Sequence, residues 1–111
     1  YQKAYWDGEY PKAVELFPQL TPDEQGNDNY RFTYANALLE TGKTNQAISI
    51  LESIIQNNRS RYVAEAHFGL AMCQLRKENI AQANDWLMRY VKLDKARKKE
   101  QANEIISKLK E

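Results

Sequence analysis

Residues 8–17 of this chain resemble residues 42–51, and this internal repeat limits the possible folds more than any other feature of the sequence. At a spacing of 34 residues, the two copies pair Gly8 with Gly42, Ala13 with Ala47, and Phe17 with Leu51. At a spacing of 36 residues, a looser third copy pairs Ala35 with Ala71, Leu39 with Leu75, Ala47 with Ala83, and Leu51 with Leu87. A fixed period of this length is typical of stacked helical hairpins. The spacing therefore predicts an all-α solenoid of antiparallel helix pairs.

The composition fits one folded domain and gives no general reason to expect nucleic-acid binding. The 111 residues are 42% apolar and 28% charged, which excludes a disordered tail. The 16 basic residues nearly balance the 15 acidic ones, so the whole chain does not attract phosphate. The charge is uneven, however, because residues 1–30 hold two lysines and six acids, whereas residues 95–111 hold six basic residues and three glutamates. Charged ends of opposite sign would bias the approach of a partner.

Turn-forming residues divide the N-terminal part into short helical segments. Gly8 closes a helix over residues 1–7, because glycine adopts the left-handed conformation after a helix end without strain. Pro11 suits the first turn of the next helix, and Pro18 ends or kinks that helix early. Thr21 caps a one-turn helix in the following loop.

Longer helices are predicted over the rest of the chain. The first runs from about Asn29 to Thr41 and stops at Gly42, and Thr44 caps the second, which ends in a turn at 57–60. The third covers residues 61–76 and is apolar on most sides, as expected for a helix in the middle of a stack.

Two more helices complete the prediction. Asn79 caps one whose inner face holds Ile80, Ala83, Leu87, Tyr90 and Val91. Asp94 caps the last, which runs to about Lys110 with a single apolar stripe of Ala102, Ile105, Ile106 and Leu109. One apolar and one polar face is what a terminal capping helix requires.

With the hairpins placed, the chain resembles the tetratricopeptide repeat (TPR) family. That family has small residues where paired helices cross, a glycine at the hairpin turn, and a large apolar residue four positions after the second small one. The matching residues are Ala35, Gly42, Ala47 and Leu51, then Ala71, Ala83 and Leu87, and before them Gly8, Tyr10, Ala13 and Phe17. Departures from the pattern are Pro18, Arg59 and Glu78, the last of which stands where a turn glycine is expected.

The resemblance implies a division of residues 1–111 into repeats. A partial repeat covers 1–25, full repeats cover 29–58 and 61–94, and a capping helix covers 95–111. It also implies a non-catalytic scaffold or adaptor without cofactor or metal, whose concave groove binds a protein, a peptide or a partner helix. The implied groove residues are Tyr5, Trp6, Phe32, Asn36, Leu39, Glu40, Phe68, Met72, Leu75 and Arg76. Most are aromatic, aliphatic or sulfur-bearing, which favours capture of an apolar segment.

Two alternatives concern these groove residues. Phe32, Phe68 and Leu75 could instead pack between neighbouring helices and leave the partner untouched. One TPR subfamily binds C-terminal carboxylates with a lysine and asparagine clamp, and Asn36 matches one of its asparagines. Phe32 and Gly69 replace other clamp residues, so the sequence predicts that this clamp is broken and that Asn36 lies at the polar rim.

The sequence gives little support for metal binding or catalysis. His67 and Cys73 are six residues apart on one predicted helix, about 120° away from a shared face, so they form neither a metal site nor a catalytic pair. The basic run Lys92, Lys95, Arg97, Lys98 and Lys99 is the alternative signal, for nucleic acid or an anionic surface. A regulatory domain of a larger enzyme is the other alternative.

The N-terminal edge is aromatic and lacks a visible polar cap. Tyr1, Tyr5 and Trp6 share the first helix, and we expect Tyr10 and Phe17 to pack on it. Such an edge predicts repeats upstream or pairing with a second copy or a partner. The chain begins at Tyr1, as expected of a trimmed product, and no signal peptide or run of about 18–20 apolar residues is visible. The compartment therefore stays open between the cytoplasm and, behind an anchor, the bacterial periplasm or envelope.

Overall fold

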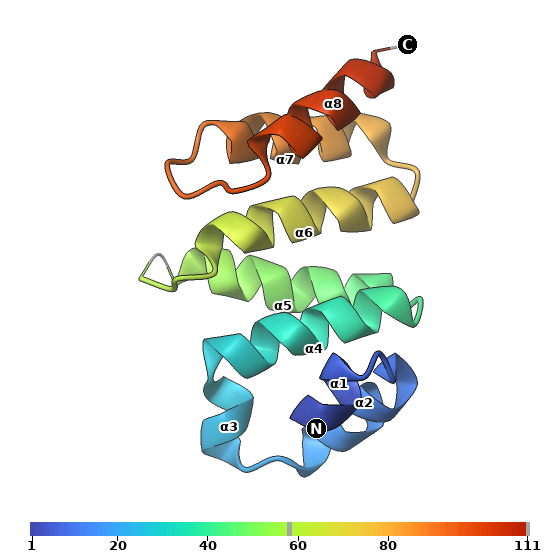
Figure 1. The fold of residues 1–111 in the computed structure, drawn as a ribbon, viewed down its shortest axis with the longest axis vertical. Helices are drawn as coiled ribbons and strands as arrows, with labels where there is room; N and C mark the ends of the chain where they lie inside the picture. Colours follow the sequence, from blue (N-terminus) through green and yellow to red (C-terminus); the bar gives the residue numbers. More distant parts are fainter. Residues whose placement is uncertain (58, 111) are drawn as a thin grey trace.

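The computed structural model describes residues 1–57 and 59–110, which form helices stacked along one long axis (Figure 1). Its extents are 43 × 28 × 22 Å. The elements are α1 (Gln2–Trp6), α2 (Tyr10–Leu16), the 3-10 helix η1 (Phe17–Gln19), α3 (Pro22–Gly26), α4 (Asp28–Glu40), α5 (Thr44–Gln56), α6 (Val63–Arg76), α7 (Ile80–Val91) and α8 (Lys99–Leu109). The predicted all-α solenoid is confirmed. Asn58 of the predicted turn and Glu111 of the predicted capping segment lie outside the described residues.

Small and aliphatic side chains pack each helix against the next one along the chain. One cluster joins α4, α5 and α6 around Leu38, Leu51, Ile54 and Leu70, all at most 1% exposed. A second cluster joins α6, α7 and α8, and its members are Ala64, Ala71, Leu87, Tyr90 and Ala102. Because α6 contributes to both clusters, it is apolar on most sides, as the sequence predicted.

Aromatic contacts hold α1 and α2 at the N-terminal edge. The ring of Tyr1 meets that of Phe17 edge-on at 5.7 Å, and the ring of Tyr5 meets that of Tyr10 at the same distance. The predicted packing of Tyr10 and Phe17 on the first helix is therefore confirmed. Pro18 lies in η1 directly after α2, so the predicted early end of that helix is also confirmed.

The helix caps differ from the prediction at several places. Thr21 caps α3 as predicted, and it does so in a capping box with Glu24. Thr44 is already the first residue of α5, and the cap position belongs to Lys43, whose side chain makes no cap bond. Asn79 does occupy the cap position of α7, but its side-chain nitrogen donates to Gln74 Oε1 at 2.9 Å. The structure adds one cap that was not predicted, because Asn27 Oδ1 accepts from the backbone N–H groups of Asn29 and Tyr30 in α4.

The predicted start of the last helix at Asp94 is wrong, because α8 begins at Lys99. Residues 92–98 form a non-helical connection instead. Leu93 and Ala96 in this connection pack on the α6–α8 cluster, and the Lys98 backbone N–H donates to Tyr90 Oη at 2.8 Å. These contacts are made by a folded loop and would be lost in a continuous helix.

The predicted burial of Ile80 on the inner face of α7 is also wrong. The buried residues of α7 are Ala83, Leu87 and Tyr90, whereas Ile80 and Met88 are each 45% exposed. Ile80 lies only about 20° from buried Leu87 around the helix axis, so its exposure comes from its position as the first residue of α7 and not from the face that it occupies.

The hairpin turns place one residue each in the left-handed region. Gly8 and Gly42 have φ values of 78° and 82°, as expected for glycines after a helix end. Glu78 takes the equivalent position between α6 and α7 with φ 62°, and is the one such non-glycine residue in the described part of the chain. A residue with a side chain in this conformation raises the free energy of the folded state, whereas glycine does not.

We expect Glu78→Gly to raise the free energy of unfolding by about 0.5–1 kcal/mol, because relief of strain exceeds the added entropy of the unfolded chain. The matched reverse change is Gly42→Glu, since a Cβ at Gly42 meets nothing within 4 Å and only the backbone would be strained. We expect it to lower stability by a similar amount. Urea denaturation of both variants measures these effects, and a less stable Glu78→Gly protein would contradict the argument.

Candidate partner-binding groove

A hollow of about 440 Å³ lies between α4, α6 and the connection after α7. Six predicted groove residues line it, namely Phe32, Asn36, Leu39, Glu40, Phe68 and Met72. Helical periodicity places them, because residues three or four apart share one face of α4 or of α6. The internal repeat adds the second wall, since Phe68 follows Phe32 and Met72 follows Asn36 at the same spacing of 36 residues.

Phe32 and Phe68 are half-buried and have contacts inside the stack. The Phe32 ring stacks on the ring of Tyr62 with a centroid distance of 5.2 Å and an interplanar angle of 21°. The Phe68 ring lies 5.2 Å from that of Tyr90. Each phenylalanine therefore packs between helices, as one alternative predicted, and also lines the hollow.

The other predicted residues lie beside the hollow or away from it. Arg76 donates to the Leu39 carbonyl oxygen at 3.1 Å and lies 3.6 Å from the Glu40 carboxylate, so its side chain spans from α6 to α4. The hollow ends before Leu75, which is not among its lining residues. Tyr5 adjoins this wall, because its hydroxyl accepts from Asn36 Nδ2 at 3.2 Å. Trp6, the last residue of α1, is 72% exposed and does not line the hollow.

Five lining residues were not predicted, and they are Glu65, Gly69, Tyr90, Arg97 and Lys98. Glu65 and Gly69 could have been found, because they continue the helical spacing of Phe68 and Met72 along α6. Arg97 and Lys98 were missed because that segment was predicted to be helical. Gly69 has a packing role as well, since a Cβ there would lie 3.1 Å from Leu51 Cδ1.

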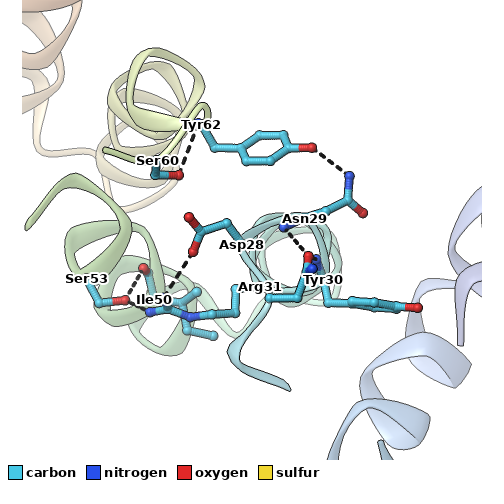
Figure 2. A network of polar contacts seen from close by, with 9 residues as sticks. Asp28, Asn29, Tyr30, Arg31, Ile50, Ser53, Ser60 and Tyr62 are labelled. Carbon is cyan, nitrogen blue, oxygen red and sulfur yellow. Dashed lines mark hydrogen bonds and ion pairs between the residues drawn. The ribbon is translucent and has the colours of Figure 1, made fainter. Parts of the chain in front are cut away.

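A polar network at the start of α4 connects this helix to α5 and to Tyr62 (Figure 2). Arg31 lies between Asp28, at 3.5 Å, and the hydroxyl of Ser53, and so ties α4 to α5. Asn29 Nδ2 donates to Tyr62 Oη at 2.6 Å. The Asn29 bond, together with the bond from the Tyr62 backbone N–H to Ser60 Oγ, holds Tyr62, whose ring stacks on that of Phe32.

A second hollow of about 360 Å³ adjoins the first around the start of α6. Its lining residues are Arg61, Glu65, Asp94, Lys95, Ala96 and Arg97. The two hollows are neighbours, because Glu65 and Arg97 line both of them. We call the two neighbouring hollows together, from Glu40 at one end to Lys95 at the other, the groove.

Cys73 and His67 lie within the helix stack, and neither is among the residues that line the groove. Cys73 is fully buried, and burial raises the pKa of its thiol to about 11, which keeps it protonated and unreactive near neutral pH. His67 Nδ1 lies 2.8 Å from the Val63 carbonyl oxygen in its own helix. Within residues 1–57 and 59–110, His, Cys, Asp and Glu side chains form no group of three able to hold a metal ion. Of the helices in this described part, none has the length and apolar character needed to cross a bilayer.

Comparison with known proteins gives one family. The family model described as anaphase-promoting complex, cyclosome, subunit 3 matches residues 6–90, which is more than three quarters of the chain. It is a TPR-like repeat family, in agreement with the resemblance seen in the sequence. No curated protein matches the sequence. The matched range includes α4 and α6, which form the walls of the first hollow.

Proposed function

Because this chain belongs to the family of the anaphase-promoting complex, cyclosome, subunit 3, we propose that it is a scaffold that binds a peptide or a partner helix in the groove. The family consists of TPR-like repeats and indicates a protein–protein interaction scaffold. We propose further that the chain acts through binding alone, without catalysis, in keeping with a typically non-catalytic family.

The observation that carries this proposal is the convergence of apolar side chains from two successive repeats on one open depression. Phe32 and Leu39 come from α4, and Phe68 and Met72 come from α6. Rigid helices hold both walls, so little conformational entropy is lost when a partner binds. Methionine and aromatic side chains at such a surface accept apolar anchors of varied shape.

The groove is short, and this limits the affinity. A segment seated across two repeats buries an area at the low end for specific interfaces, below about 1,200 Å². Two or three anchors should then supply most of the binding energy. Tight binding would require a second contact elsewhere in the assembly.

We expect Met72→Ala to weaken binding of the partner by about 1–3 kcal/mol while lowering stability less. The partner would first be identified by pull-down, and affinity then measured by calorimetry next to urea denaturation. Met88→Ala is the matched control, because Met88 is a half-exposed methionine on α7 that does not line the groove. We expect the control to bind as the parent protein does.

The Phe32→Ala variant tests whether Phe32 contributes to partner binding or only to packing in the core. If Phe32 only packs on Tyr62, stability should fall by about 2–5 kcal/mol and binding should change only through unfolding. If both Phe32→Ala and Met72→Ala proteins are well folded and bind with unchanged affinity, the groove is not the binding site.

A further inference from the structure

We propose that the groove selects an apolar segment that carries acidic side chains next to its anchor residues, and that these acids lie at the α7–α8 end. The inference rests on the proposed function and names the chemistry of the partner. It comes from the charges around the groove, which differ between its two ends.

The α7–α8 end of the groove is cationic. Arg97 lines both hollows, Lys98 lines the first, and Arg61 and Lys95 line the second. The acids among the lining residues at this end are Glu65 and Asp94, so four cations face two carboxylates.

Within residues 1–57 and 59–110, these four cations form no ion pair. The ion pairs of the described residues are Lys3 with Asp7, Lys12 with Glu9, Arg31 with Asp28, and Arg76 with Glu40. Among those residues, none of the four cations at the α7–α8 end therefore has a carboxylate within ion-pair distance. The opposite end differs, because Arg76 already neutralises Glu40.

Lys98 is held in place next to an apolar anchor site. Its backbone N–H donates to Tyr90 Oη, and its Nζ lies 5.1 Å from the centroid of the Phe68 ring. An anchor residue that contacts the Phe68 ring would bring the neighbouring positions of its own segment to this ammonium group. A carboxylate at such a position would form an ion pair at the edge of an apolar contact, where screening by water is weaker than on an open surface.

Glu65, which lines both hollows, offers a recognition element of a different kind. Its Oε2 atom is buried and has no hydrogen-bond partner among the described residues. A buried acceptor of this kind is stabilised when a donor reaches it. A backbone N–H or an amide side chain of the bound segment is such a donor.

We expect the side-chain carboxylates of the bound segment to contact these cations, and its C-terminal carboxylate is not required. Lys95, Arg97 and Lys98 come from the connection after α7, and Arg61 lies directly before α6. An amidated peptide should therefore bind as tightly as one that ends in a free carboxylate.

The test uses a display library of random peptides of about 12 residues, roughly three helical turns, selected on the intact chain. We expect the enriched peptides to combine apolar residues at helical spacing with Asp or Glu beside them. Enriched peptides would be synthesised with their acids kept, with glutamine in place of the acids, and with an amidated C-terminus. The glutamine version should bind about tenfold more weakly at low salt, and the amidated version should bind unchanged.

A matched pair of double variants shows which part of the protein the acidic side chains of the peptide contact. The double variant Arg97→Glu/Lys98→Glu should weaken the acidic peptide about tenfold and leave the glutamine version within about twofold. The double variant Lys108→Glu/Lys110→Glu makes the same change of charge at exposed Lys108 of α8 and at exposed Lys110 directly after it, and it should change the affinity for neither peptide. A spin label beside the acids should broaden the amide signals of Tyr90 and Ala96 more than those of Leu39 and Glu40.

The outcomes separate this inference from the proposed function. Enriched peptides without acidic residues, whose binding Met72→Ala still weakens, would overturn the inference and leave the groove intact. Selection of no peptide that depends on Phe32 or Met72 would overturn both. A random single-stranded oligonucleotide that binds more tightly than any selected peptide, and is lost in Arg97→Glu/Lys98→Glu, would assign this end to nucleic acid and overturn the inference.

Discussion

Leu51→Ala should lower the free energy of unfolding by about 2–5 kcal/mol, because it removes a fully buried side chain and leaves a cavity. Leu51 is 1% exposed and packs in the cluster that joins α4, α5 and α6. It also fills the space beside Gly69, where a Cβ would lie only 3.1 Å from it. Urea denaturation followed by circular dichroism would measure the loss.

Ile80→Ala serves as the control for Leu51→Ala, since Ile80 is 45% exposed on α7. The cost there should stay below about 1 kcal/mol, as for surface substitutions generally. Equal losses in the two variants would show that burial in the α4–α6 cluster does not determine stability.

Ala47→Leu should lower the free energy of unfolding by about 1–3 kcal/mol for the opposite reason, because the added side chain has no space. Ala47 is fully buried beside Ala35 and Leu38, where α5 crosses α4. A larger side chain at that position forces the two helix axes apart. The groove should be affected too, because α4 forms one of its walls.

The matched change on the exposed side of the same helix is Gln46→Leu. Leucine and glutamine have similar helix propensities, so this variant should remain within about 0.5 kcal/mol of the parent. An Ala47→Leu protein as stable as Gln46→Leu would contradict the role of small residues at the crossings.

The repeat spacing was enough to predict the architecture, because it repeats the small residues and turn glycines that stacked hairpins need. Ala47 and Ala83 are fully buried, and Gly8 and Gly42 have positive φ angles, as that pattern requires. The same period also predicted one feature of the groove, because it places Phe32 and Phe68 at equivalent positions on the two helices that form its walls. Local periodicity and a fixed repeat length are properties of the sequence itself.

The connection after α7 could not be predicted in this way. Helix formers fill residues 95–100, so propensity favoured a helix that starts after Asp94. The contacts of Leu93, Ala96 and Tyr90 outweigh this preference, and they involve residues that are brought together only by the packing of α8 on α7. The cationic end of the groove was missed for the same reason, since its position depends on that loop.

The position of α6 in two hydrophobic clusters has a consequence for cooperativity. A solenoid behaves as a row of units coupled only to their neighbours, and it can fray from either end. Because Leu70 and Ala71 of α6 face different clusters, this helix is the unit through which loss of α8 and α7 is transmitted to α5 and α4. A ligand that holds α6 against α4 therefore opposes fraying that begins at the far end of the molecule, and the stack and its binding surface gain stability together.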